Sequence, residues 1–165
     1  MAPHQALRET KKTKAKRALR SLAIAIAIPV TLNIGVIILC GSGHKYHQLA
    51  KPIWFAPLWF IHLATLGSSF FMGLAAWLVW ADGVFKLEPD ALPLYVAQVS
   101  LSIVWEPFVV NAHWLALVSS IVNFGTLFMC YLRFRKVNPF AKDLAKPCLL
   151  WAGYLTLVSF KLMFL

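Results

Sequence analysis

The chain has 165 residues, of which 60% are hydrophobic and 13% charged, and its mean hydropathy is +0.70. Soluble domains carry about 25% charged residues, and disordered chains are poor in aromatic residues, so the composition excludes both classes. The formal net charge of +10 is unevenly placed, because the first 20 residues hold seven of the 16 Lys and Arg residues.

The basic segment 1–20 is predicted to be a cytosolic tail in front of a membrane domain at 21–165. Lys and Arg beside a membrane span anchor it against anionic lipid, and this explanation is preferred to nucleic-acid binding. The apolar run after the tail is longer than the core of a signal peptide, which disfavours a cleaved signal.

Four apolar stretches follow the tail and predict five transmembrane helices. About 20 residues cross the hydrocarbon core as a helix. The stretch from Ala91 to Leu132 has 42 residues with Glu106 as its only charge, so it must hold two helices, broken at residues 111–113. The runs do not alternate in polarity as barrel strands would, and the predicted fold is an all-α membrane bundle. The predicted helices are 21–43, 57–81, 91–110, 114–134 and 144–163.

The basic residues also predict the orientation of the bundle. With a cytosolic N-terminus, 13 of the 16 Lys and Arg residues lie on the cytosolic side, against Lys45, Lys51 and Lys161 on the other. The positive-inside rule therefore places the N-terminus in the cytosol and the C-terminus on the opposite side. Segment 44–56 is then the one long non-cytosolic connection, and its aromatic residues are expected to fold back over the bundle.

Seven tryptophans stand out in a chain of this length. Trp59 and Trp80, near the two ends of the second predicted helix, fit an aromatic belt at the membrane interfaces. Four others could line a flat apolar cavity under segment 44–56, where indole faces would stack on a planar ligand. These four are Trp54, Trp105, Trp114 and Trp151. Belt and core packing are the alternative for them.

Two ionisable residues, His62 and Glu106, lie inside predicted spans. Such groups indicate functional sites by default, although Glu106 is close enough to the 111–113 turn to reach interfacial water. His62 is either a buried histidine with a hydrogen-bond partner or an axial ligand of haem iron. The three cysteines lack the spacing of a metal site, and no nucleotide-binding, zinc-protease or serine-hydrolase motif occurs.

The second predicted helix carries small residues on one face. Ser69 and Gly73 lie four residues apart, which is the small-xxx-small spacing of close helix contacts in membranes. Close packing is therefore expected there, either within the bundle or in a dimer.

Segment 46–59, which reads YHQLAKPIWFAPLW, resembles the signature of the translocator protein family, also called TspO/MBR or tryptophan-rich sensory proteins. The family pattern is approximately WYxxLxKPxWxPPxW. Segments 73–80, 95–107 and 138–151 extend the resemblance, which covers about residues 20–165. The basic extension is most similar to the plant branch.

The resemblance implies a five-helix bundle that often dimerises and encloses a cavity under the first loop. Family members bind haem and porphyrins, and animal members bind cholesterol and synthetic drugs. The expected ligand is therefore a tetrapyrrole, haem or protoporphyrin, held by a scavenger, carrier or stress-linked sensor. A sterol or lipid carrier and a porphyrin-degrading enzyme are alternatives. The expected location is endoplasmic reticulum or Golgi membrane, with the mitochondrial outer membrane as the alternative.

The resemblance also implies a set of ligand-binding residues. Family cavity positions correspond to Tyr46, Trp54, Trp105, Trp114 and Trp151. The ligand-facing Asn of the third helix is Ser102 here, the residue after its Trp is Glu106, and a Trp of the second helix is Thr65. Because an amide donor and part of an aromatic wall are missing, binding of the synthetic drugs is in doubt. Ser102 and Glu106 complete the predicted set, with His62 as the candidate haem ligand.

Overall fold

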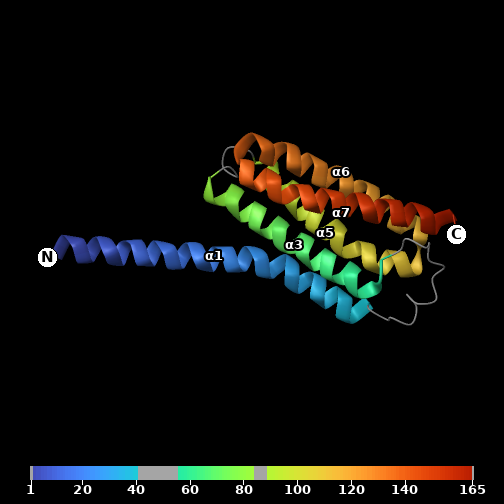
Figure 1. Cartoon of the computed structure of the whole chain (residues 1–165), viewed down its shortest axis with the longest axis horizontal. Helices are drawn as coiled ribbons and strands as arrows, with labels where there is room; N and C mark the ends of the chain where they lie inside the picture. Colours follow the sequence, from blue (N-terminus) through green and yellow to red (C-terminus); the bar gives the residue numbers. More distant parts are fainter. Residues whose placement is uncertain (1, 41–55, 84–88, 165) are drawn as a thin grey trace.

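The structure, a computed structural model, describes residues 2–40, 56–83 and 89–164 (Figure 1). The described residues form five helices long and apolar enough to cross a membrane, and no strand. The predicted all-α membrane bundle is confirmed, and the chain is a multi-pass membrane protein. The helices are α1 (Ala2–Cys40), α3 (Leu58–Ala81), α5 (Ala91–Asn111), α6 (His113–Val137) and α7 (Pro139–Phe164).

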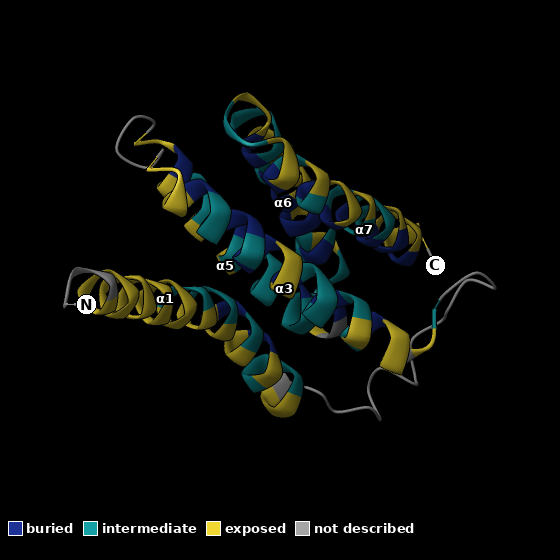
Figure 2. Cartoon of the chain, turned by 60° about the vertical axis from the view of Figure 1, so that its left-hand side comes forward, coloured by how far each residue is buried: buried dark blue, intermediate teal, exposed yellow. Residues whose placement is uncertain are grey.

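The five helices are arranged as a ring. Helix α1 packs against α3, α3 against α7, α7 against α6 and α6 against α5, while α5 returns to α1 over a much smaller contact. Buried residues lie along the facing sides of α3, α5, α6 and α7, whereas α1 is mostly exposed (Figure 2). The ring therefore encloses an interior but is weakly closed between α1 and α5.

Local sequence signals explain where the helices end. Gly83 follows α3 with φ of +74°, a conformation that favours glycine, and its N–H donates to the Trp80 carbonyl at 2.9 Å. The chain breaks between α5 and α6 at Ala112 alone, with φ −154° and ψ 92°, inside the predicted 111–113 break. Asn138 adopts the extended conformation that a following proline favours, and its Oδ1 accepts the N–H of Phe140 at 2.9 Å. This cap starts α7 at Pro139, five residues before the predicted start at 144.

The largest difference from the predicted helices is at the N-terminus. Helix α1 has 39 residues and runs from the basic segment 1–20 into the apolar span without interruption. Figure 1 shows its N-terminal part projecting beyond the bundle. Residues 5–20 are exposed throughout. Ala, Lys and Arg dominate this part of the helix, and all three have high helix propensity.

The predicted close packing of the small-residue face is confirmed within the bundle. A Cβ on Gly73 would lie 2.7 Å from the carbonyl oxygen of Ala25 on α1. This carbonyl is four residues before Pro29, which has no N–H to donate to it. One turn away, Asn33 Nδ2 donates to Ser69 Oγ at 2.8 Å. Small and hydroxyl side chains thus bring α1 and α3 together.

Two apolar clusters hold the other helices together. One includes Met72, Leu127, Phe134 and Cys148 and lies toward the end of the bundle from which the basic segment 1–20 projects. The other, which includes Trp105 and Val158, lies toward the opposite end. Buried polar side chains, such as Gln98 and Asn123, lie between the two clusters.

Candidate functional site

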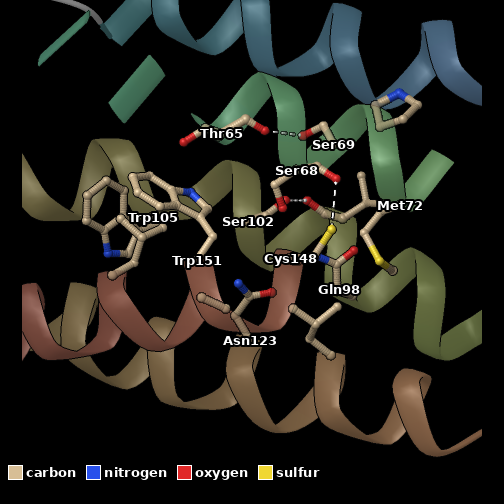
Figure 3. A pocket seen from close by; sticks show the side chains of 15 residues that line it. Thr65, Ser68, Ser69, Met72, Gln98, Ser102, Trp105, Asn123, Cys148 and Trp151 are labelled. Carbon is tan, nitrogen blue, oxygen red and sulfur yellow. Dashed lines mark hydrogen bonds between the residues drawn. The ribbon is translucent and has the colours of Figure 1, made fainter. Parts of the chain in front are cut away.

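A central pocket lies in the ring, and every helix contributes to its lining (Figure 3). Pro29 comes from α1, and apolar residues such as Met72 and Leu155 form part of the wall. The rest is polar, which is costly in a membrane interior and marks a functional site by default. The polar lining residues are Thr65, Ser68 and Ser69 from α3, Gln98 and Ser102 from α5, and Asn123 from α6.

Four polar atoms of this pocket are buried without a hydrogen-bond partner among the described residues. They are Thr65 Oγ1, Gln98 Oε1, Asn123 Oδ1 and Trp151 Nε1. A buried polar group left unpaired costs about 1–3 kcal/mol. The indole N–H can only donate and the two amide oxygens can only accept. The pocket therefore offers both kinds of hydrogen bond to whatever occupies it.

The central pocket is small in this structure. Its volume is about 30 Å³, and one water needs about 10–15 Å³. Two or three waters fit, and a larger ligand would have to widen the ring or insert only a part of itself.

A larger aromatic groove lies between α3 and α7 and adjoins the central pocket at Ser68 and Trp151, which line both. Its volume is about 600 Å³, within the range of about 300–1,000 Å³ for small-molecule sites. Trp151 stacks on Tyr154 with ring centroids 5.2 Å apart, and Phe60 meets Trp151 edge-on at 6.1 Å. The hydroxyl of Tyr154 accepts the N–H of Ala56 at 3.0 Å. This bond fixes the start of α3 against α7.

The structure brings three of the predicted site residues together. Ser102, Trp105 and Trp151 all line the central pocket. Trp105 is 3% exposed and its Nε1 donates to Ser159 Oγ at 2.9 Å, so its indole is held in one orientation. The Ser102 hydroxyl donates to the Val99 carbonyl at 2.8 Å. Of the three, only the side chain of Trp151 has no hydrogen-bond partner among the described residues.

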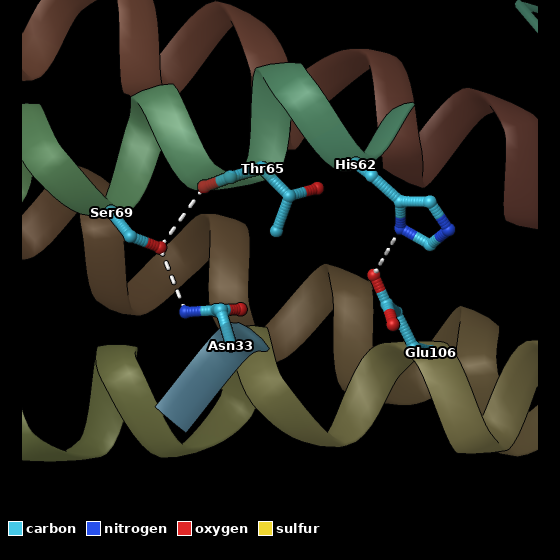
Figure 4. A network of polar contacts seen from close by, with 5 residues as sticks. All are labelled: Asn33, His62, Thr65, Ser69 and Glu106. Atoms are coloured by element: carbon cyan, nitrogen blue, oxygen red, sulfur yellow. Dashed lines mark hydrogen bonds and ion pairs between the residues drawn. The ribbon is translucent and has the colours of Figure 1, made fainter. Parts of the chain in front are cut away.

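Glu106 and His62 form a pair of their own outside both cavities (Figure 4). His62 Nδ1 lies 3.2 Å from Glu106 Oε1, and this contact joins α3 to α5. Neither residue lines the central pocket or the α3–α7 groove. Glu106 therefore faces a histidine, which is a more specific partner than the interfacial water expected from the sequence.

The structure does not place the remaining predicted site residues in either cavity. Trp114 is 60% exposed on α6 and lines neither cavity, an environment that fits the interfacial belt. Tyr46 and Trp54 lie outside the described residues, so their place in the cavity stays a prediction. Trp59 and Trp80 are 66% and 54% exposed, as expected for belt residues.

Sequence reasoning did not select two central-pocket residues, Gln98 and Asn123, as site residues, and it treated Thr65 only as a departure from a family pattern. All three are less than 10% exposed. The signal that could have found them is an uncharged polar side chain inside an apolar span, which must find a partner or face a cavity.

Fold and site together define a class: a five-helix multi-pass membrane protein with a polar pocket at the centre of the ring and an aromatic groove beside it. Residues 22–165 match the TspO/MBR family. The chain belongs to this family. The resemblance inferred from segment 46–59 is thereby confirmed.

Proteins named for translocation are similar over most of the chain. A "Translocator protein homolog" of Arabidopsis thaliana is 42% identical over 158 residues, which is 94% of this chain and 81% of that protein. "Translocator protein 2" of Canis lupus familiaris is 31% identical over 85% of this chain and 86% of its own. The "Translocator protein" of Homo sapiens is 28% identical over the same shares.

Proposed function

We propose that this translocator-family membrane protein binds a tetrapyrrole, haem or protoporphyrin, as a scavenger, carrier or stress-linked sensor. The observation that carries the proposal is the environment of Trp151. Its indole lines an aromatic groove of about 600 Å³, and its N–H, which has no partner among the described residues, belongs to the polar central pocket. A planar ligand can stack in the groove and place a polar edge toward the pocket.

The chemistry of the two cavities supports a ligand with one flat apolar face and one polar edge. Among the described residues, the groove is lined by Phe60, Phe71, Trp151 and Tyr154 and by no charged side chain. The described residues that line the central pocket are also uncharged. The polar edge of a tetrapyrrole consists of its propionic acid groups. A protonated one could bond to the Trp151 N–H and to an amide oxygen of the pocket, whereas a charged one would stay outside the helices, near interfacial water, because burying an unpaired carboxylate is costly.

A sterol is the rival ligand, because its hydroxyl could use the same donor and acceptors in the central pocket. Its saturated rings have no π-system to stack on Trp151. Porphyrin affinity should therefore depend more on the aromatic ring at this position than sterol affinity does. A porphyrin-degrading enzyme is a further alternative, and product analysis after illumination of the protein with bound protoporphyrin would reveal it.

The test is absorbance titration of the full chain in nanodiscs with haem and with protoporphyrin. Trp151→Ala is expected to weaken both affinities several-fold, because aromatic stacking contributes about 0.5–1.5 kcal/mol beyond area burial. Trp151→Phe should keep part of the affinity, since it keeps a ring but loses the N–H. Trp80→Ala is the matched control, since Trp80 lines neither cavity. Equal losses from Trp151→Ala and Trp80→Ala would contradict the proposal.

We also propose that the protein lies in endoplasmic reticulum or Golgi membranes, from its resemblance to the plant branch, with its N-terminus in the cytosol. The mitochondrial outer membrane is the alternative. Fractionation of the tagged chain against marker proteins of the three membranes distinguishes these locations.

A further inference from the structure

The weak closure of the ring between α1 and α5 leaves a second groove, separate from the cavities described above. It opens at the end of the bundle that carries the basic segment, and its volume is about 300 Å³. Three helices line it: Ile24 and Ile28 come from α1, Trp77 and Trp80 from α3, and Leu92 and Tyr95 from α5. The lining is almost wholly apolar.

The groove exists because α1 packs on α3 and meets α5 over a short stretch. A hydrogen bond fixes this arrangement, since Trp77 Nε1 donates to Ser21 Oγ at 3.0 Å. The large side chains at its rim stay uncovered: Ile24, Ile28 and Trp80 are each more than half exposed. In a bilayer, a hydrocarbon chain lying between them would fill the gap.

The mouth of the groove carries positive charge. Arg17 lies four residues before Ser21, and Arg20 lies four residues before Ile24, so both arginines continue the helix face that lines the groove. Within the described parts of the chain neither arginine forms an ion pair, with Asp90 at the start of α5 or with any other carboxylate. About 16 Å separates Ile28 from Arg17 along the helix axis, at a rise of 1.5 Å per residue.

We infer that this groove binds one acidic glycerophospholipid, with an acyl chain between α1, α3 and α5 and its phosphate at Arg17 and Arg20. An apolar slot that ends in two guanidinium groups, neither with a carboxylate partner among the described residues, matches an amphiphile with an anionic head. Arginine suits phosphate because its planar fork can donate two parallel hydrogen bonds. A sterol or a zwitterionic lipid would leave the excess positive charge without a matching head.

The experiment uses the full chain in nanodiscs of equal phosphatidylserine and phosphatidylcholine, and native mass spectrometry counts the lipids that remain bound after release. We expect one phosphatidylserine to be retained. Arg17→Gln/Arg20→Gln should lower its retention at least fivefold. The control Arg8→Gln/Lys11→Gln removes the same charge two or more turns farther from the groove and should keep it.

A second pair of variants tests the slot without changing charge. Ile24→Trp fills the groove and should lower phosphatidylserine retention, whereas Leu32→Trp, at an exposed position of α1 that does not line it, should not. Helix content and monodispersity of each variant confirm its fold. Equal retention of the two lipids, equal losses from both charge pairs, or no effect of Ile24→Trp would each overturn the inference.

Discussion

Two groups of polar side chains in the spans of this bundle differ in what they face, while others, such as Ser102, bond to a carbonyl of their own helix. In the first group, each side chain pairs with one on another helix and so fixes the distance between the two helices. These pairs are Ser21–Trp77, Asn33–Ser69, His62–Glu106 and Trp105–Ser159. In the second group, four atoms lack a partner among the described residues, and all four line the central pocket. Pairing therefore separates the structural polar residues from those available to a ligand.

His62 belongs to the first group, which sets the expectation for its substitution. His62→Ala should lower the stability of the bundle by about 1–3 kcal/mol, because it leaves the partly buried Glu106 carboxylate without its partner. Haem and protoporphyrin affinities should change alike, since His62 lines neither cavity. Thermal unfolding and the haem Soret band are the measurements.

The alternative, that His62 ligates haem iron through Nε2, predicts a different pattern. The variant would then lose haem affinity and shift the Soret band while its protoporphyrin binding stays intact. Glu106→Gln is the matched control, because it removes the carboxylate and keeps the imidazole. A selective loss of haem in His62→Ala alone would establish ligation.

Helix α3 is the element that contacts α1 on one side and α7 on the other, and its two glycines have different surroundings. Gly73→Ala should destabilise the bundle by about 1–3 kcal/mol, because the new methyl group would meet the backbone of α1 at Ala25. Gly67→Ala is the control, since nothing lies within 4 Å of its Cβ position. Alanine should be tolerated or stabilising there, because it favours the helix by about 1 kcal/mol over glycine. Thermal unfolding in one detergent compares them, and equal changes would contradict the close approach at Gly73.

The sequence predicted the helices well because hydropathy counts apolar residues, and about 20 of them make a span. The ends were less accurate where local capping decides them. Asn138 starts α7 early through its side chain, and the basic segment continues α1 although it is not apolar. Neither effect changes the hydropathy of the spans.

The sequence pointed to some of the residues that line the central pocket but could not tell which of the candidate residues face it. Trp105 and Trp114 are equally good cavity candidates by residue type, yet one is 3% and the other 60% exposed. The difference depends on which face of each helix meets its neighbours, and the order of helices in the ring sets that. Spans that are apolar on every side carry little periodicity from which to read a face. The pairing of His62 with Glu106 required the same knowledge.

At the scale of the whole molecule, the distribution of basic residues predicts the topology. A tag at the N-terminus should be digested by protease added to the cytosolic side of sealed vesicles, and a tag at the C-terminus should be protected. The reason is the split predicted from the sequence, in which 13 of the 16 Lys and Arg residues fall on the side of the N-terminus. Digestion of the C-terminal tag from the cytosolic side would contradict the predicted orientation.

The length of α1 sets a distance between the bilayer and the first residues of the chain. Its 39 residues extend about 58 Å, while the hydrocarbon core is about 30 Å thick. Arg8 is 13 residues before Ser21, so a helix that continues along its axis holds it about 20 Å farther from the membrane. The surface potential of the lipid decays over about 8 Å at physiological ionic strength. The outermost basic residues therefore behave as charges in bulk solvent, and an acidic molecule approaching them would compete with dissolved salt and not with lipid headgroups.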